Sequence, residues 1–479
     1  MRWLLLALCA VACRGEVQES PRTARSTSPS ASPVAAPSSA IGAQPSAPDA
    51  ASDAPNQDVD LTQRAHAPRY PFGAIHSPID ARQVAVWEAH VAAHPGLRED
   101  RFMKVGDSIT ASGDSLFCIG RPQTLKALEA ARPTSQPSVH PSKQAPLLHS
   151  ALDPALHQAA LHFGAGGPYG GSFGRTSAAA VVGWSAHSAL FGGLRQEQQA
   201  LRARYALIQF GTNDIEVGAI HHFADKLFDV VEQVHRAGAL PVLYTIPSRA
   251  DRARSAAEVP RYNAVIRGLA QAFEAPLVDL HLALSALPRR GLTGDGIHPT
   301  TYSGPAGRAP CDFSPQGLEA GYNRRNHLTL EVLARLLAAR AGKLGEARRQ
   351  AEWSGDGTNS TPYEPPGWPL IDFSARAAEL PAGPCGGAAR GVSYRLRLTE
   401  RARVELLGFD RRVARDVVLS SEAEPQRCLG SDARRLRLEL PAGSYRVELR
   451  EVKASPEEAP GSRSALEVGS LLVARIDGE

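Results

Sequence analysis

The chain has 479 residues, with 53 lysines and arginines against 49 aspartates and glutamates and a formal net charge of +4. This length exceeds what a single hydrophobic core supports, and it favours two or three folding units. The basic residues are dispersed along the chain, so the charge pattern argues against a nucleic-acid-binding protein.

The N-terminus has the features of an export signal. Residues 1–13 (MRWLLLALCAVAC) combine one basic residue with an apolar stretch from Trp3 to Ala12 that is too short to cross a bilayer. The small residues Ala10 and Ala12, directly before Cys13, resemble the lipobox of bacterial lipoproteins. The resemblance implies cleavage before Cys13, lipidation of its thiol and an anchored protein in the periplasm or on the cell surface. Ordinary secretion is the alternative.

Two low-complexity stretches divide the rest of the chain. Residues 14–60 are mostly Ser, Pro, Ala, Thr and Gln without apolar periodicity, and such a composition cannot offset the entropy of ordering the chain. We therefore expect a disordered tether there. A second linker is expected over residues 353–369. These boundaries predict a main domain over residues 61–352 and a smaller domain over residues 370–479.

The main domain alternates predicted helices and strands. A helix is expected between Ser77 and His94, and a strand over residues 102–105 follows it. The later strands are expected at 176–182, 205–210, 240–246 and 276–280, and the later helices at 220–234, 262–273 and 314–341. Strands that alternate with helices predict a parallel sheet with right-handed crossovers.

One segment, residues 121–170, interrupts this pattern with proline clusters, and we expect an insertion that roofs a cleft. It contains four histidines, which are His140, His149, His157 and His162. They lack a His-x-x-x-His pair and a companion cluster of carboxylates, so no metal site is predicted.

The C-terminal part of the chain changes to a period of two. Apolar residues alternate with polar ones in six short runs, at 392–398, 404–407, 417–419, 436–440, 445–449 and 471–476. This pattern predicts a small antiparallel β-sandwich.

A candidate nucleophile follows the first strand of the main domain. The run RFMKVGDSIT breaks abruptly at Gly106, which indicates a buried strand that ends in a tight turn carrying Ser108. Open α/β folds place their ligands at this edge of the sheet. The alternative is a strand followed by a helix that has Ser108 or Thr110 as its N-cap.

A candidate acid and base stand on one loop before the last helix of the main domain. In GDGIHP, Asp295 precedes His298 by three residues, so its carboxylate can accept the Nδ1 proton and leave Nε2 free as a general base. The alternative for an isolated Asp-x-x-His is a turn-capping aspartate beside a surface histidine.

The stretches KVGDSIT, FGTND and DGIHP occur in this order, and each follows a predicted strand of one sheet. In this combination they resemble the sequence blocks of the SGNH (GDSL) hydrolase superfamily over about residues 102–341. The resemblance implies a three-layer α/β/α, flavodoxin-like domain with a parallel sheet. It also implies a serine esterase that works through an acyl-enzyme and needs no metal or organic cofactor.

The resemblance also implies roles for single residues. Ser108 matches the nucleophile, His298 the base and Asp295 the acid that orients it. Asn213 matches the side-chain amide that donates to the oxyanion, together with the backbone N–H of Ser108. Asp107 and Asp214 adjoin these positions and are expected to hold their turns.

The glycine of the oxyanion hole is less evident, because the family's frequent Asn-x-x-x-x-Gly form is missing. Gly183, in VVGWSA, ends a predicted strand and opens a helix as the family glycine does, so it is preferred to Gly174. Trp184 lies next to it and is a candidate contact for a sugar or an acyl group. A place in the core is the alternative for this tryptophan.

Export also affects the cysteines. With Cys9 in the signal and Cys13 lipidated, Cys118, Cys311, Cys385 and Cys428 remain, and an even number in an oxidising compartment favours two disulfides. Cys385 and Cys428 would bridge the β-sandwich. Cys118 and Cys311, if they anchor loops beside the cleft, would tie the nucleophile segment to the histidine segment; buried free thiols are the alternative.

The sequence thus predicts an extracytoplasmic serine esterase that acts on a small ester or an acylated polysaccharide, with carbohydrate O-acetyl esters favoured. One alternative is a lipase or lysophospholipase that acts on longer acyl chains. The other is a non-catalytic surface-binding lipoprotein in which the β-sandwich binds the ligand. Contact with a membrane is expected only through the N-terminal lipid.

Overall fold

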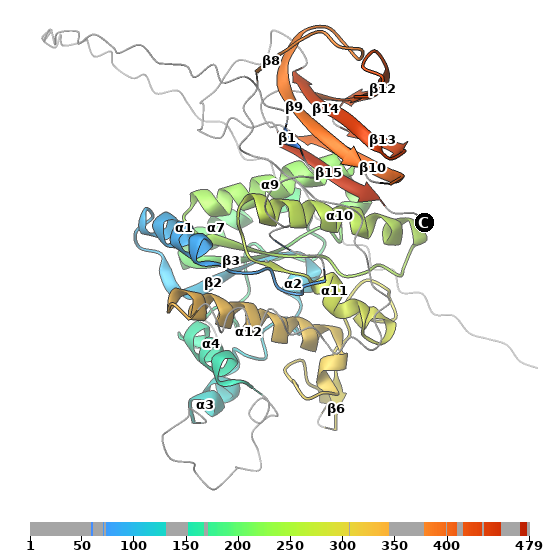
Figure 1. Ribbon diagram of the computed structural model, residues 1–479. Helices are drawn as coiled ribbons and strands as arrows, with labels where there is room; N and C mark the ends of the chain where they lie inside the picture. The colour runs from blue at the N-terminus through green and yellow to red at the C-terminus, as the bar shows by residue number, and fades with distance from the viewer. Residues whose placement is uncertain are drawn as a thin grey trace, which may run out of the picture. The chain divides into compact units, whose positions relative to one another are not determined.

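The fold is known from a computed structural model, shown in Figure 1. It describes residues 59–60, 70, 73–130, 152–166, 171–305, 307–343, 378–398, 400–409, 415–433, 435–451 and 470–476. All of these belong to one compact unit, residues 54–479. The predicted export signal, Cys13 and the linker at 353–369 lie outside the described residues. Strand β1 (Val59–Asp60) pairs with strand β9, so the last two residues of the predicted tether belong to a sheet.

A parallel sheet of four strands forms the centre of the main domain. Its order is β2 (Arg98–Gly106), β3 (Ala203–Gln209), β4 (Leu240–Tyr244) and β5 (Leu277–Val278). Successive residues of β3 face opposite sides, because Tyr205 and Leu207 belong to one hydrophobic core and Ala206 and Ile208 to the other. The parallel sheet of the sequence analysis is confirmed.

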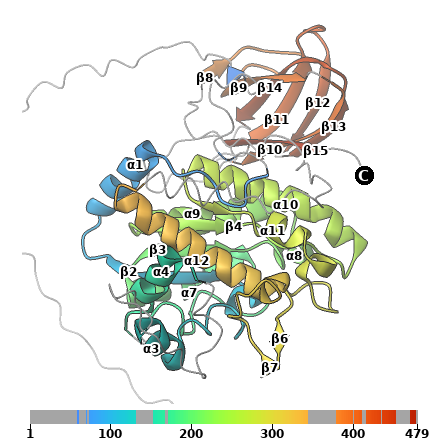
Figure 2. The ribbon, with the colours of Figure 1, turned by 60° about the horizontal axis from the view of Figure 1, so that its bottom comes forward.

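Helices cover both faces of this sheet, as Figure 2 shows. One core is shared with α7 (Gly193–Leu201), α9 (Ile220–Arg236) and α10 (Ala253–Ala272). The other is shared with α1 (Ala81–Ala92), α3 (Pro122–Ala130), α4 (Pro154–Gly164), α11 (Leu280–Ser285) and α12 (Gly321–Arg340). The domain therefore has the predicted three layers.

The prediction of a strand at 176–182 is wrong, because this segment makes only a parallel bridge between Ala180 and Gly106. The side chain of Ser177 takes the place of further ladder bonds. Its hydroxyl donates to Lys104 O at 2.6 Å and accepts from Ala179 N at 3.0 Å. The segment still occupies the flavodoxin-like position on the free side of β2.

Two helices differ from their expected bounds. Helix α10 begins at Ala253, before the expected start at residue 262. It continues through Pro260, although proline normally ends a helix. Helix α12 begins only at Gly321, after a short 3₁₀ turn, η2 (Gly317–Glu319). A Cβ at Gly321 would lie 2.3 Å from Gly291 O, so close approach to a neighbouring loop sets this start.

The described parts of the 121–170 insertion pack on a face of the sheet, and the expected roof over a cleft stays a prediction. Phe163 of α4 meets the rings of Phe102 and Tyr205 edge to face, at centroid distances of 5.7 and 5.8 Å. His157 Nε2 donates to Leu128 O at 2.7 Å and so joins α4 to α3. Residues 131–151 and 167–170 lie outside the described residues.

The C-terminal residues form two antiparallel sheets around a separate core, as the period of two predicts. The first sheet has the order β1-β9-β14-β11-β12, with β8 beside β9, and the second has the order β13-β10-β15. Their bounds are β8 (Ala378–Leu380), β9 (Ala389–Leu398), β10 (Ala402–Phe409), β11 (Arg415–Ser421), β12 (Cys428–Ala433), β13 (Arg435–Leu440), β14 (Gly443–Glu451) and β15 (Ser470–Ile476).

Both expected disulfides are confirmed. Cys118 pairs with Cys311, which joins the segment after the candidate nucleophile to the segment after His298. Cys385, before β9, pairs with Cys428 at the start of β12. None of the described helices combines the length and the apolar composition that crossing a membrane requires.

The two disulfides constrain loops of different length. Their sequence separations are 193 and 43 residues, so chain entropy predicts stabilisation by about 5 kcal/mol for Cys118–Cys311 and about 4 kcal/mol for Cys385–Cys428. We expect the C118S/C311S variant to lose at least as much free energy of unfolding as the C385S/C428S variant. Urea unfolding of both variants and the wild type measures this, and an unchanged midpoint for C118S/C311S would contradict it.

Candidate active site

The candidate nucleophile lies in a crowded turn at the end of β2. A Cβ at Gly106 would lie 2.4 Å from Thr110 Oγ1 and 2.7 Å from Gln209 O, so no side chain fits at this position. Asp107 caps helix α2 (Ser108–Ala111), because its Oδ1 accepts from Ile109 N at 2.9 Å. Ser108 therefore stands at the carboxyl edge of the sheet, and Asp107 is the N-cap in place of Ser108 or Thr110.

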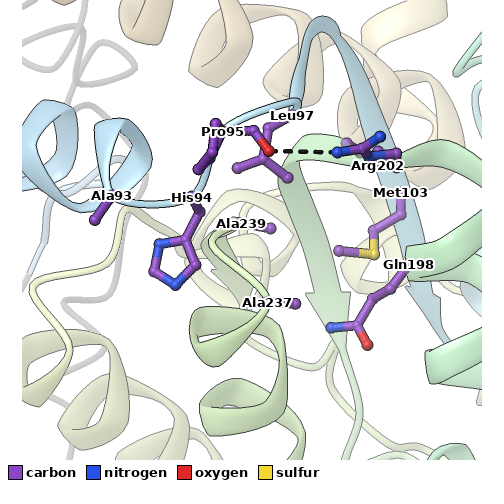
Figure 3. Close-up of a pocket in the computed structure, with 10 residues that line it drawn as sticks. Ala93, His94, Pro95, Leu97, Met103, Gln198, Arg202, Ala237 and Ala239 are labelled. Carbon is purple, nitrogen blue, oxygen red and sulfur yellow. Dashed lines mark hydrogen bonds between the residues drawn. The ribbon is translucent and has the colours of Figure 1, made fainter.

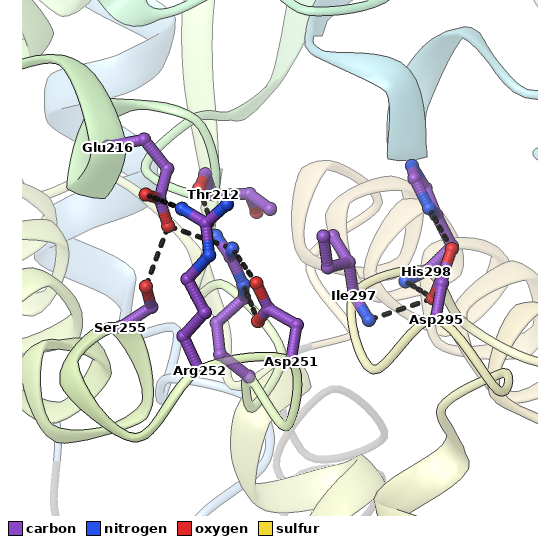
Figure 4. A network of polar contacts seen from close by, with 9 residues as sticks. Thr212, Glu216, Asp251, Arg252, Ser255, Asp295, Ile297 and His298 are labelled. Atoms are coloured by element: carbon purple, nitrogen blue, oxygen red, sulfur yellow. Dashed lines mark hydrogen bonds and ion pairs between the residues drawn. The ribbon is translucent and has the colours of Figure 1, made fainter.

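His298 lies between Ser108 and Asp295, and Figure 4 shows its pair with Asp295. Ser108 Oγ and His298 Nε2 are 2.8 Å apart, and His298 Nδ1 and Asp295 Oδ2 are 2.7 Å apart. A carboxylate that accepts the Nδ1 proton leaves Nε2 able to accept from the serine hydroxyl. The tertiary structure thus brings the three residues into the geometry of a nucleophile, a general base and an orienting acid.

The loop that carries Asp295 is held by its own carboxylate. Oδ1 accepts hydrogen bonds from Thr293 Oγ1 at 2.6 Å and from the backbone N–H groups of Ile297 and His298 at 2.8 and 3.0 Å. Partial burial alone would raise the pKa of Asp295, but these bonds and that from His298 Nδ1 outweigh it and hold the pKa well below its usual range. The acid beside His298 therefore stays ionised.

Asn213 and Asp214 join the turn after β3 to the turn that carries Trp184. Asn213 precedes helix α8 (Asp214–Val217), and its Nδ2 donates to Trp184 O at 2.9 Å. The buried carboxylate of Asp214 accepts from Gly211 N at 3.0 Å and from Ala186 N at 2.9 Å. Asp214 therefore holds its turn, as the sequence analysis expects, and also holds the neighbouring one.

The two glycine candidates for the oxyanion hole lie in different surroundings. Gly183 precedes Trp184, whose carbonyl receives the Asn213 amide, and its φ of +81° is in the left-handed region that favours glycine. Gly174 packs instead against Gly120, where an added Cβ would lie 2.4 Å from Gly174 N. The structure places Gly183 beside Asn213, while its role as an oxyanion donor stays a prediction.

The Trp184 ring is half-buried and packs inside the domain. A Cβ at Gly193 would lie 2.6 Å from Trp184 Cη2, and the indole borders the core on that face of the sheet. This packing agrees with the alternative of a core tryptophan. The contact of Trp184 with substrate stays a prediction.

A buried cation near the nucleophile turn was not predicted from the sequence. Arg325 of α12 donates from Nε to Gln209 Oε1 at 2.9 Å, from Nη1 to Ser115 Oγ at 2.6 Å and from Nη2 to Thr110 Oγ1 at 3.2 Å. It thereby joins the end of β3 to the segment that follows Ser108. No sequence signal marks it, because a charged residue on the inner face of a helix is explained only by partners from distant segments.

The described residues contain no group of three or more His, Cys, Asp and Glu side chains that could hold a metal ion. His157 bonds to Leu128 O, and His162 Nε2 donates to Glu99 O at 3.2 Å. His140 and His149 lie outside the described residues.

A cavity of about 350 Å³ opens near the start of β3, at the amino edge of the sheet (Figure 3). Its lining includes His94, Leu97, Met103 and Arg202, and Arg202 Nη2 donates to Pro95 O at 3.3 Å. Ser108, Asn213 and His298 are not among its lining residues, so this cavity is separate from the candidate active site.

Two carboxyl groups next to the site are buried, which makes their ionised forms less stable. Burial raises the pKa of Asp107 to about 6 and the pKa of Asp214 to about 7. The hydrogen bonds that each accepts from backbone N–H groups oppose this rise and do not cancel it. The turns on both sides of the site are therefore held by carboxyl groups that ionise less readily than exposed ones.

The pH dependence of stability tests the burial of Asp107. Because the pKa is higher in the folded chain, the contribution of Asp107 to the free energy of unfolding is complete below about pH 4 and is lost as the pH rises through about 6. Asp107→Asn keeps the oxygen that accepts from Ile109 N but cannot titrate. Urea unfolding should show the variant gaining on the wild type by up to about 3 kcal/mol between pH 4 and 7. Parallel curves for the two proteins would contradict the prediction.

Part of the chain matches the sequence model of a known protein family. Residues 105–302 match the sequence model of the GDSL-like lipase/acylhydrolase family, a range that includes Ser108, Asn213, Asp295 and His298. No curated protein sequence matches the chain.

The fold also resembles solved structures at low sequence identity. A GDSL-like lipase from Bacteroides thetaiotaomicron is 14% identical, with 53% of this chain and 98% of that chain covered and a TM-score of 0.30. An acetylxylan esterase from Geobacillus stearothermophilus is 14% identical, with 50% and 96% covered and a TM-score of 0.30. The family match, which spans the whole Ser108–His298–Asp295 arrangement, identifies residues 105–302 as a GDSL-like lipase/acylhydrolase domain, a hydrolase that acts on ester bonds.

Proposed function

We propose that the chain is a serine esterase that hydrolyses short-acyl esters, with O-acetyl groups on carbohydrates as its substrate class. The observation that carries the proposal is the chain of contacts from Ser108 Oγ through His298 to Asp295. As Oγ attacks the carbonyl carbon, its proton passes to His298 Nε2, and the Asp295 carboxylate stabilises the imidazolium that forms. His298 then protonates the departing alcohol, and an ester between Ser108 and the acyl group remains.

The second half of the reaction uses the same groups. Water attacks the acyl-enzyme, gives its proton to His298 Nε2 and releases the carboxylic acid as Ser108 regains its proton. In both halves the carbonyl oxygen becomes negatively charged. The second Nδ2 hydrogen of Asn213 and the backbone N–H groups of Ser108 and Gly183 would stabilise this charge, which exists only in the tetrahedral intermediate.

The preference for a short acyl group on a large hydrophilic molecule rests on how open the site is. The side chains of His298 and Asp295 are 38% and 47% exposed, so the base and its acid lie at the surface. An open site admits an ester carried by a polymer, whereas a long acyl chain is best held where apolar walls bury most of its surface. The intact contact chain also argues against a non-catalytic binding protein, which has no need of it.

A lipase or lysophospholipase is the second candidate, because three apolar side chains stand exposed near the oxyanion side. Val182 precedes Gly183 and is 72% exposed, and Val217 ends helix α8 and is 69% exposed. Phe191, which follows helix α6 (Ala186–Ala189), is 76% exposed. Exposed apolar groups of this kind suit a longer acyl chain or a lipid surface.

Hydrolysis of p-nitrophenyl esters separates these candidates. We expect kcat/KM for the acetate to exceed that for the octanoate, because the open site offers a long chain few apolar contacts. Ser108→Ala should remove the turnover of both. A preference for octanoate would favour the lipase, and turnover that survives Ser108→Ala would contradict the proposed mechanism.

We also propose that the protein is exported and anchored through lipid on Cys13. Its two disulfides support this proposal, because disulfides persist in oxidising compartments outside the cytoplasm. In a bacterial host, the full chain should partition into the membrane fraction, and Cys13→Ser should move it to the soluble fraction or the medium. Recovery of both proteins from the cytosol would contradict export.

A further inference from the structure

A buried arginine lies between the two halves of the candidate active site. Arg249 belongs to the loop that follows β4, and only 4% of its side chain is exposed. Its loop carries none of the motifs that the sequence shares with the hydrolase family, so no role was predicted for it. Figure 4 labels its partners Thr212, Glu216 and Asp251 and, apart from them, the Asp295–His298 loop.

All three nitrogens of the Arg249 guanidinium group donate hydrogen bonds. Nε and Nη2 donate to the two oxygens of Asp251, both at 2.7 Å, in a bidentate pair. Nη2 also donates to Glu216 Oε1 at 2.9 Å, and Nη1 donates to Thr212 O at 2.7 Å. The carboxylates hold the guanidinium plane, so that Nη1 points at a backbone carbonyl.

That carbonyl belongs to the residue directly before Asn213. Thr212 O belongs to the planar peptide group whose nitrogen is Asn213 N, so a bond to this oxygen restricts the rotation of the whole group. At its other end, the Asn213 amide is held by the bond from Nδ2 to Trp184 O. With the backbone and the side chain both held, the second Nδ2 hydrogen keeps one direction.

The same loop is also attached to the base side. Ala250 N donates to Gly296 O at 2.8 Å, within the loop that carries Asp295 and His298. A Cβ at Gly296 would lie 2.6 Å from Asp251 N, so the two loops are in close contact. The backbone of this loop therefore contacts the histidine loop, while the Arg249 side chain contacts the turn that carries Asn213.

We propose that Arg249 is a positioning residue that acts through Thr212 O to aim the Asn213 amide at the oxyanion. This inference rests on the proposed esterase function and adds to it a residue outside the family blocks. Arg249 does not touch the reacting atoms, and its effect on catalysis passes through Asn213.

Arg249 and its two carboxylate partners, Asp251 and Glu216, stay charged over the pH range in which activity is measured. Hydrogen bonding to Asp251 raises the pKa of Arg249, and hydrogen bonding to Arg249 lowers the pKa of Asp251. The pKa of Glu216 is lowered first by its hydrogen bond from Ser255 Oγ. An Arg249 variant should therefore change the rate without changing the shape of the pH profile.

A double-mutant cycle tests the inference. Asn213→Ala should lower kcat about 100-fold or more, because it removes one oxyanion donor. Arg249→Lys keeps the charge but loses the planar fork, and we expect kcat to fall about 10- to 100-fold with KM nearly unchanged. In the Asn213→Ala background, the same substitution should lower kcat less than about 3-fold, because the amide that Arg249 orients is then absent.

A second cycle shows that the coupling is specific. Thr293→Val removes the hydrogen bond from Thr293 Oγ1 to Asp295 on the base side, and its effect should multiply with that of Arg249→Lys. Arg252→Lys is the matched control, because Arg252 is 68% exposed and pairs with the outer oxygen of Glu216. It should leave kcat unchanged. If Arg249→Lys does not fold, Asp251→Asn replaces it in both cycles with a smaller expected loss.

The outcomes separate the inference from the proposed function. Turnover of p-nitrophenyl acetate is measured beside the rate at which a fluorophosphonate labels Ser108. A wild type that shows neither reaction overturns the esterase proposal and this inference together. An active wild type in which Arg249→Lys and Asn213→Ala simply multiply would overturn the inference alone, since Arg249 would then only stabilise the fold.

Discussion

Parallel pairing of the central strands is the constraint on which this site depends. Because β2, β3, β4 and β5 run in one direction, their carboxyl ends meet at one edge of the sheet, and the loops that follow them must lie side by side. Ser108 follows β2, Asn213 follows β3 and Arg249 follows β4. His298 reaches the same edge from beyond β5. No single segment contains the site, and the sheet assembles it.

Polar contacts between side chains and backbone then fix the loops that the sheet brings together. Asp214 accepts from two turns, Asp295 holds its own loop, and Arg249 donates to the carbonyl before Asn213. Such contacts are directional, and they hold groups at defined positions more accurately than apolar packing does. A site that stabilises charge in a transient intermediate needs its donors in place before the charge forms.

This arrangement buries charged side chains at positions where apolar side chains would destabilise the folded chain less. Asp107 and Asp214 ionise less readily than exposed carboxyls because they are buried, and Arg325 is buried below the nucleophile turn. Each is nevertheless hydrogen-bonded to segments distant in sequence or to the neighbouring turn. The domain therefore accepts a cost in stability at the edge where its catalytic groups lie, and the Cys118–Cys311 disulfide joins two of the segments involved.

The sequence by itself determined the parallel α/β domain and the β-sandwich, because apolar periodicity is a local feature. It favoured both disulfide pairs from the even number of cysteines, and the structure settled them. It also indicated Ser108, Asp295, His298 and Asn213, whose motifs lie next to strand ends. Only the tertiary structure decided that residues 176–182 form a bridge in place of a strand, that α4 packs on the sheet, and that Arg249 and Arg325 bind distant loops. These features depend on partners far away in sequence, and a side chain's partners exist only once the chain has folded around it.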